Sequence, residues 1–302
     1  MLKKLSITLL SLLLVLGGTK ATLAETVLEK VARTGVLTLG SDLDLVPYAY
    51  VNSKGELDGY TLNIVNLIRQ EVEQQVGRPV ALEIVEAKGI TERITKLLTG
   101  EIDLACDTAF TWTRDKYIDF SISYGIAGIK LLVPKNSNLG TPESLVDKRI
   151  GLVPKTVSEK AIKLAQPKAN LVNFETLEAA LMALKEGKVD AVAGDNIILD
   201  GLRQKAGLLD TKLVPQTSYA NYGVACMVAQ NNSGFLRLMN YSIVKFMEGY
   251  LAQEKTSSEI VDRWLGPNGI TRVDPEAVRS FFNYTVMSHE QIPLTNTVQG
   301  AK

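Results

Sequence analysis

The segment ITKLLTGEIDLACD, residues 94–107, reads as the end of a helix, a glycine stop, and a short apolar strand that ends in an aspartate. The segment LMALKEGKVDAVAGD, residues 181–195, repeats the same order. Helices that alternate with short apolar strands are typical of α/β folds whose strands are mostly parallel. The repeat therefore predicts two similar lobes, each with a central strand that ends in an acid, Asp107 in one lobe and Asp195 in the other.

The rest of the chain shows the same alternation between amphipathic and short apolar runs. Ligands of open α/β sheets bind beyond the carboxyl ends of the strands, so two lobes that face each other there would form a cleft with Asp107 and Asp195 in its walls. The expected helices are 61–77, 90–100, 158–165, 176–187 and most of the chain beyond about residue 235, and the expected strands are 36–42, 80–87, 102–106, 148–154, 169–174 and 189–195.

Length and composition limit the classes of function. The 302 residues suffice for two domains, and the balance of 33 basic and 33 acidic side chains argues against a nucleic-acid partner. The single histidine, His289, lies in the C-terminal tail, which argues against histidine-assisted nucleophiles and histidine-rich metal sites. GLVPKT at 151–156 has Pro154 where a phosphate-binding loop needs glycine before its lysine. We therefore expect binding without covalent chemistry, a cofactor or a metal.

The N-terminus, residues 1–24, has the pattern of a cleaved signal peptide. Lys3 and Lys4 precede an apolar run at 5–16, and small residues lead to a cleavage site expected after Ala24. The apolar run is short for a membrane span, which disfavours the alternative of an uncleaved anchor. Since no cysteine lies near the cut, the mature chain is expected to be an exported, soluble protein and not a lipoprotein.

The chain contains two cysteines, Cys106 and Cys226. Each lies in an apolar, strand-like run, IDLAC for the first and YGVACMV for the second. An oxidising compartment permits a disulfide between them, but two buried thiols are equally compatible with the spacing.

Two charged residues are candidates for ligand contacts. Arg114 could hold a carboxylate with its planar guanidinium, although a surface ion pair with Asp115 or Asp119 is the common alternative. Asp195 could accept from an ammonium group, or could cap the helix that follows it. Four aromatic residues could form the wall of a pocket or part of the core: Tyr48, Phe110, Trp112 and Tyr222.

Four blocks of sequence, in this order, resemble family-3 periplasmic solute-binding proteins of ABC importers for polar amino acids. The blocks are GSDLDLVPYAYVNSKGELDGYTLNI (40–64), ITKLLTGEIDLACDTAFTWTRDKYIDFS (94–121), KRIGLVPKTVSE (148–159) and EGKVDAVAGD (186–195). The two cysteines and the ending DRWLGPNG (262–269) resemble the glutamate/aspartate-binding branch most. The resemblance implies a non-catalytic, monomeric periplasmic protein that delivers an amino acid to an ABC transporter permease.

The resemblance also implies a type II periplasmic-binding-protein fold. In such a fold two α/β lobes are joined by two crossing strands and close on a ligand in the cleft between them. Mapped onto this chain, lobe 1 comprises 25–126 and 217–302, and lobe 2 comprises 127–216. Members of the glutamate/aspartate branch place their cysteines on neighbouring strands, which favours a disulfide between Cys106 and Cys226.

The resemblance assigns roles to individual residues. Arg114 and Thr156 are expected to bind the α-carboxylate of the ligand, and Asp195, with Asp107, its α-ammonium group. Asp42, Arg93 and Lys155 are expected to set the side-chain preference. The remaining expected contacts come from the first-lobe loops: Thr108, Tyr48, Phe110 and Trp112.

Several positions depart from the family pattern and leave the ligand open. Asp42 stands where the acidic branch has an arginine, and Leu177 where it has a histidine. Leu45 stands where binders of basic amino acids have a stacking aromatic, and Ala109 where the family has a hydroxyl. Either the ligand has cationic character, or Lys155 neutralises an aspartate within the protein.

Two other classes of function use the same scaffold. One is a sensing module that feeds a membrane receptor with the same binding chemistry. The other is an enzyme that resembles cyclohexadienyl dehydratases, in which Asp107 or Asp195 would act as general acid if burial raised its pKa.

Overall fold

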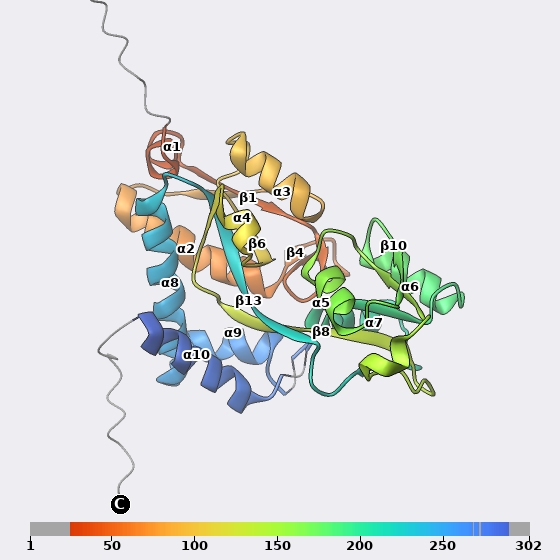
Figure 1. The fold of residues 1–302 in the computed structure, drawn as a ribbon. Helices are drawn as coiled ribbons and strands as arrows, with labels where there is room; N and C mark the ends of the chain where they lie inside the picture. The colour runs from red at the N-terminus through yellow and green to blue at the C-terminus, as the bar shows by residue number, and fades with distance from the viewer. Residues whose placement is uncertain (1–24, 268, 272, 290–302) are drawn as a thin grey trace, which may run out of the picture.

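The computed structural model describes residues 25–267, 269–271 and 273–289, and Figure 1 shows two groups of elements joined by long strands. The predicted signal peptide, 1–24, lies outside the described residues. One ten-stranded sheet runs through the molecule in the order β10-β9-β11-β8-β13-β6-β1-β5, while β12 pairs with β8 and β7 with β13. Its strands are β1 Val36–Ser41, β5 Ala81–Glu86, β6 Leu104–Ala109, β7 Ile118–Phe120, β8 Gly125–Pro134, β9 Arg149–Leu152, β10 Asn170–Asn173, β11 Ala191–Asp195, β12 Thr211–Val214 and β13 Ala220–Ala229.

Strand direction divides the sheet into three parts. β5, β1 and β6 are parallel at one end, and β10, β9 and β11 are parallel at the other. We call the elements around these two ends the first and the second lobe. The middle strands, β8 and β13, run antiparallel to each other and to their outer neighbours β11 and β6. The prediction of mostly parallel strands is therefore confirmed within each lobe and wrong for the middle, where two long strands cross between the lobes.

Helices cover both lobes (Figure 1). They are α1 Val27–Thr34, α2 Tyr60–Val76, α3 Gly89–Leu98, α4 Trp112–Asp115, α5 Val157–Ala165, α6 Leu177–Lys185, α7 Asn196–Lys205, α8 Ser233–Leu251, α9 Lys255–Trp264 and α10 Pro275–His289. A 3-10 turn, η1, spans Pro142–Leu145, and a small sheet consists of β2 Asp44–Leu45, β3 Ala49–Val51 and β4 Leu57–Asp58. Among the described residues, no helix is both long and apolar enough to cross a membrane.

Helix α2 shows how the sequence fixes these elements. Ile64, Ile68 and Val72 recur at intervals of four residues, which places them on one face, and all three are buried in the first-lobe core. Gly77 ends the helix in the left-handed conformation, with φ of 69°, and its N–H bonds the carbonyl of Glu73. The predicted helix 61–77 is thus confirmed within one residue at each end.

The C-terminal helix α10 packs on α8 and inserts Phe282, which is 1% exposed, between Phe246 and Tyr250. This packing adds the end of the chain to the first lobe. The predicted lobe boundary at 126/127 falls inside β8, and the boundary at 216/217 falls shortly before β13. The boundaries themselves stay a prediction.

Helix α7 of the second lobe lies directly against the first lobe. Lys205 Nζ is 3.4 Å from Asp44 Oδ1 in β2. A Cβ atom added at Gly201 would lie 2.5 Å from the carbonyl oxygen of Val46, so the absence of a side chain permits this close approach. The two lobes therefore touch beside the crossing strands as well as being joined by them.

Candidate functional site

A cavity of about 380 Å³ lies between the lobes at the carboxyl ends of β6 and β11. It is wide enough for a small polar molecule. The first lobe contributes Asp42, Asp44, Lys88, Thr91, Arg93, Asp107, Thr108 and Arg114, the second lobe contributes Thr156, Ser158, Glu175, Thr176, Glu178 and Asp195, and the crossing strand β13 contributes Tyr222.

Arg114 extends from the short helix α4 into the cavity wall. Its Nη1 donates to Thr108 Oγ1 at 3.1 Å and to the carbonyl oxygen of Ala109 at 3.0 Å. Among the described residues it forms no ion pair, so the alternative pairing with Asp115 or Asp119 is wrong. Burial, with the nearby charge of Arg93, lowers the pKa of Arg114. An oriented guanidinium that has no carboxylate partner in the described part of the chain is suited to bind an anionic group.

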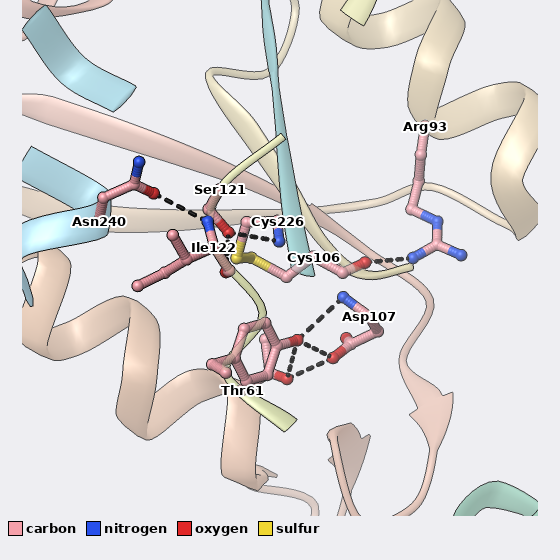
Figure 2. Close-up of a disulfide and its surroundings, with 9 residues drawn as sticks. Thr61, Arg93, Cys106, Asp107, Ser121, Ile122, Cys226 and Asn240 are labelled. Atoms are coloured by element: carbon pink, nitrogen blue, oxygen red, sulfur yellow. Dashed lines mark hydrogen bonds between the residues drawn. A yellow bond between two sulfur atoms is a disulfide. The ribbon is translucent and has the colours of Figure 1, made fainter. Parts of the chain in front are cut away.

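Arg93 is a second, more deeply buried guanidinium, with 6% of its surface exposed. Its Nη1 donates to the carbonyl oxygen of Cys106 at 2.6 Å, and its Nε donates to that of Gly89 at 3.3 Å. Figure 2 shows this arginine approaching the backbone directly beside the disulfide. The backbone of β6 thus positions Arg93 at the cavity.

The disulfide between Cys106 and Cys226 is confirmed, and the alternative of two free thiols is wrong. The cysteines lie on the neighbouring strands β6 and β13, with their Cα atoms 3.8 Å apart. Ser121 accepts from the Cys226 backbone N–H at 3.0 Å, and Asn240 accepts from the N–H of Ile122 at 2.9 Å (Figure 2). The disulfide and these hydrogen bonds therefore hold together the strands next to Arg93 and the residue that follows Cys106.

That following residue, Asp107, has a left-handed backbone, with φ of 59°. Its Oδ1 accepts from the Tyr124 hydroxyl at 2.7 Å and from the Thr61 hydroxyl, and its backbone N–H donates to the Tyr124 oxygen at 3.0 Å (Figure 2). Burial raises the pKa of Asp107, while the two hydroxyl donors and Arg93 oppose that shift. Because both hydroxyl donors bind Oδ1, Oδ2 has no donor among the described side chains.

Asp195 has one of its two predicted roles, the helix cap, and its carboxylate also lies at the cavity wall. Its Oδ1 caps α7 by accepting from the N–H groups of Ile197 at 2.8 Å and Ile198 at 3.1 Å. Its Oδ2 accepts from the Tyr222 hydroxyl, and the residue lines the cavity although only 5% of its surface is exposed. Burial raises the pKa of Asp195, and the charge of Asp107 adds to this. The Asp195 carboxylate therefore caps α7 and lines the cavity at the same time.

Thr156 and Lys155 differ in where they point. Thr156 lines the cavity at the start of α5, and its hydroxyl donates to the Val153 carbonyl at 2.8 Å. Lys155 has φ of 61° and an exposed side chain, is absent from the described cavity wall, and uses its backbone N–H to bond Glu159. The structure therefore does not place Lys155 beside an aspartate of the cavity, because the left-handed turn directs its side chain to solvent.

The three aromatic residues predicted to shape the pocket lie outside the described cavity wall. Tyr48 is 1% exposed and packs in the core, and its hydroxyl has no hydrogen-bond partner among the described residues. Phe110 and Trp112 are 41% and 78% exposed and stack edge to face on the surface of the first lobe. Tyr222 is the aromatic residue that the sequence singled out and that does line the cavity.

Three acids of the cavity wall were missed by the sequence analysis: Asp44 in β2 of the first lobe, and two glutamates of the second lobe. Glu175 and Glu178 lie at the start of α6, just after β10 ends at Asn173. The sequence contained a signal for both glutamates, because residues that follow the carboxyl end of a parallel strand lie on the ligand side of the sheet. Asp42, which was predicted, lines the cavity opposite them and accepts from the Gly89 N–H at 3.3 Å.

A comparison with known protein families gives a context for this cavity. The family described as bacterial extracellular solute-binding proteins, family 3, matches residues 37–267. The chain belongs to this family. Its members are extracellular or periplasmic proteins that bind solutes, and the type II fold predicted from the resemblance is confirmed.

Curated relatives of this family-3 protein bind amino acids. A glutamine-binding protein of Geobacillus stearothermophilus is 31% identical over 191 residues, which cover 62% of this chain and 71% of the relative. An L-glutamate/L-aspartate-binding protein of Pseudomonas aeruginosa is 27% identical over 248 residues, which cover 78% of this chain and 79% of the relative.

Solved structures share the same architecture. An ancestral arginine-binding protein bound to arginine is similar, with a TM-score of 0.64, 25% identity, and coverage of 77% of this chain and 99% of that one. An ancestral amino acid-binding protein described as a precursor of cyclohexadienyl dehydratase has a TM-score of 0.66 at 22% identity, with coverage of 78% and 98%. At this level of identity the second likeness shows the fold alone.

Proposed function

We propose that this family-3 protein is the periplasmic substrate-binding component of an ABC importer for a polar amino acid or a related zwitterion. The observation that carries the proposal is the distribution of charge in the interlobe cavity, with Arg114 in the first lobe and Asp195 in the second. An amino acid has a carboxylate and an ammonium group on one carbon, and a cavity with a cation and an acid on facing walls complements both. The named relatives, which bind glutamine or glutamate and aspartate, support the same ligand class.

In this proposal the ligand closes the lobes by bridging them. Arg114 and Thr156 bind the α-carboxylate, and Asp195 and Asp107 bind the α-ammonium through the carboxylate oxygens that face the cavity. Each contact is a charge-assisted hydrogen bond, and closure of the lobes would exclude water from it and strengthen it.

The ligand side chain would lie toward the part of the cavity wall formed by Asp42, Arg93, Glu175 and Glu178. This mixture of acids and one guanidinium fits a polar or charged side chain better than an apolar one, because an unpaired buried charge is costly. Lys155, whose side chain is exposed, is left out of the proposed site.

The proposal is tested by a thermal-shift screen of the common L-amino acids, ornithine and citrulline on folded, ligand-free protein, followed by calorimetry of the best binder. Arg114→Lys should weaken binding, since lysine cannot form the paired bonds of a guanidinium. Trp112→Ala is the matched control on the same helix and should bind normally. A screen in which no compound shifts the folded protein would contradict the proposal.

We also infer a non-catalytic role. A dehydratase on this scaffold would need a protonated carboxyl in the cavity, whereas Asp195 accepts two backbone N–H bonds and one hydroxyl bond, and Asp107 accepts two hydroxyl bonds. Burial raises the pKa of both acids, and these donors oppose that rise. The named relatives are binding proteins, which supports the non-catalytic role. Formation of phenylpyruvate from prephenate by the purified protein would contradict this inference.

Transport and sensing share the same binding chemistry and differ in the partner. The importer role predicts that the ligand-loaded protein, as a monomer, is captured by an ABC permease in detergent or nanodiscs and stimulates its ATPase. Capture by a membrane receptor without stimulation of any permease would favour the sensing module instead.

A further inference from the structure

A single tyrosine connects the crossing strands to the acid of the second lobe. In β13, Tyr222 lies opposite Ala127 of β8, and on the other side of β8, Asp195 of β11 lies opposite Ile129. Directly paired residues project from the same face of a sheet, and so do residues two apart in one strand. All four side chains therefore share a face, and the short Ala127 lets the Tyr222 hydroxyl reach across β8 to bond Asp195 Oδ2.

This hydroxyl is the side-chain donor on which Asp195 depends. Both backbone donors from α7 bind Oδ1, so among the described residues Tyr222 alone donates to Oδ2. Asp195 is 5% exposed and has no ion-pair partner within the described part of the chain. A buried carboxylate stays ionised only with donors or a cation nearby, so loss of the hydroxyl would disfavour the charged form.

Tyr222 also lies within electrostatic reach of the first lobe. The positive charge of Arg114 acts on the Tyr222 hydroxyl, and both residues line the cavity. The tyrosine thus contacts the proposed ammonium-binding acid of the second lobe and faces the proposed carboxylate-binding cation of the first. No other residue of the described cavity wall belongs to a crossing strand.

We propose that Tyr222 is a positioning residue for the ammonium group of the ligand: its hydroxyl holds the Asp195 carboxylate in place at the cavity wall. This inference rests on the proposed amino-acid-binding function and adds a requirement to it. Removal of the hydroxyl should weaken binding of compounds with an α-ammonium group and leave compounds without one unaffected.

The test compares Tyr222→Phe with Tyr219→Phe, a matched control from the same segment. The Tyr219 hydroxyl donates to the Gly140 carbonyl at 2.7 Å, and the residue is not part of the described cavity wall. The probes are the L-amino acid with the largest thermal shift in the screen above and the same compound with hydrogen in place of its α-ammonium group. Since hydrogen bonds to charged groups contribute about 1.5–3 kcal/mol, Tyr222→Phe should lower affinity for the amino acid about tenfold or more. Its affinity for the deamino probe, and both affinities of Tyr219→Phe, should equal those of the wild type.

The pH dependence of affinity provides a readout that a purely structural role would not change. The titratable groups that interact with Asp195 are Tyr222, whose hydroxyl bonds it, and Tyr48 and Asp107, which act on it through their charges. Affinity for the amino acid should decrease as pH falls, because protonated Asp195 no longer attracts an ammonium group. The Tyr222 bond lowers the pKa of Asp195, so Tyr222→Phe should move this decrease to higher pH.

Each result decides one question. Equal affinities of Tyr222→Phe and wild type, an equal loss for the amino and deamino probes, or a loss without movement along the pH axis would overturn the inference. If wild type binds no amino acid at all, the proposed function fails instead. Should Tyr222→Phe not fold, Ala127→Val blocks the path across β8 while leaving the tyrosine in place, and should produce the same selective loss.

Discussion

Removal of the disulfide should destabilise the protein strongly, because the bond closes an unusually long loop. Cys106 and Cys226 are 120 residues apart, and the intervening chain contains the entire predicted second lobe. For a separation of 120 residues, the loss of unfolded-chain entropy corresponds to about 5 kcal/mol, and measured losses for native disulfides are about 2–5 kcal/mol. The double variant C106S/C226S should therefore lose several kcal/mol of unfolding free energy while the two serines retain most of the side-chain volume.

The measurement is urea unfolding followed by tryptophan fluorescence and by circular dichroism. Trp264 is fully buried in the first lobe, so its emission reports the unfolding of the lobe that carries the bond. Wild type reduced with dithiothreitol is the matched control and should unfold at the same urea concentration as C106S/C226S. A loss below about 1 kcal/mol with an unchanged urea dependence would refute the loop-entropy reasoning, since such a value lies under the usual range for native disulfides.

Three further predictions concern the cavity and the lobes. Arg114→Lys should weaken binding of the best amino acid from the screen by about tenfold to a hundredfold in calorimetry, because the paired guanidinium bonds are lost. Its melting temperature should be unchanged. Undiminished affinity would contradict the role of Arg114 in binding the carboxylate. Burial raises the pKa of Asp195, so the folded state holds its proton more tightly than the unfolded state and the ligand-free protein loses stability as pH rises from the ordinary value of 3.8 through the raised one. Asp195→Asn, which keeps the helix cap, should therefore raise the melting temperature of the ligand-free protein at pH 7 and flatten its dependence on pH. The same variant should not bind the amino acid. A lower melting temperature would refute the conclusion that ionised Asp195 destabilises the ligand-free protein. Gly201→Ala should push α7 away from Val46, since the new Cβ would lie 2.5 Å from a carbonyl oxygen. Calorimetry should then show weaker ligand binding, and small-angle scattering should show a larger radius of gyration for the ligand-bound protein. An unchanged radius of gyration would show that the contact is not needed for closure of the lobes.

The sequence predicted those features that depend on local pattern. Helix 61–77 was found because its apolar spacing and terminal glycine act within a few residues, and the structure places α2 at Tyr60–Val76. The acids at the ends of two central strands, Asp107 and Asp195, were found because the carboxyl end of a parallel strand is a position defined by the chain itself. The cavity-facing placement of Arg114 followed the family resemblance and agrees with the geometry.

The incorrect expectations concern residues whose side-chain placement depends on the local backbone direction or on packing partners from other segments. Lys155 lies two residues before Val157, the first residue of α5, but its left-handed backbone directs the side chain outward. Trp112 lies two residues before Arg114 in the same short helix, yet it is 78% exposed. The family resemblance implied the two crossing strands, but their antiparallel pairing was not predicted, since hydrophobic runs reveal a strand but not its neighbours.

By itself, the sequence determined the α/β class, the six parallel strands of the two lobes with the helices between them, and the residues that could bear opposite charges in a cleft. These follow from periodicity and from residue chemistry, which act over short stretches of chain. Only the tertiary structure decided that Cys106 bonds Cys226 and that Tyr222 reaches Asp195 across β8. Such pairings depend on which strands become neighbours, and strand order is set by the packing of the whole sheet and not by any one segment.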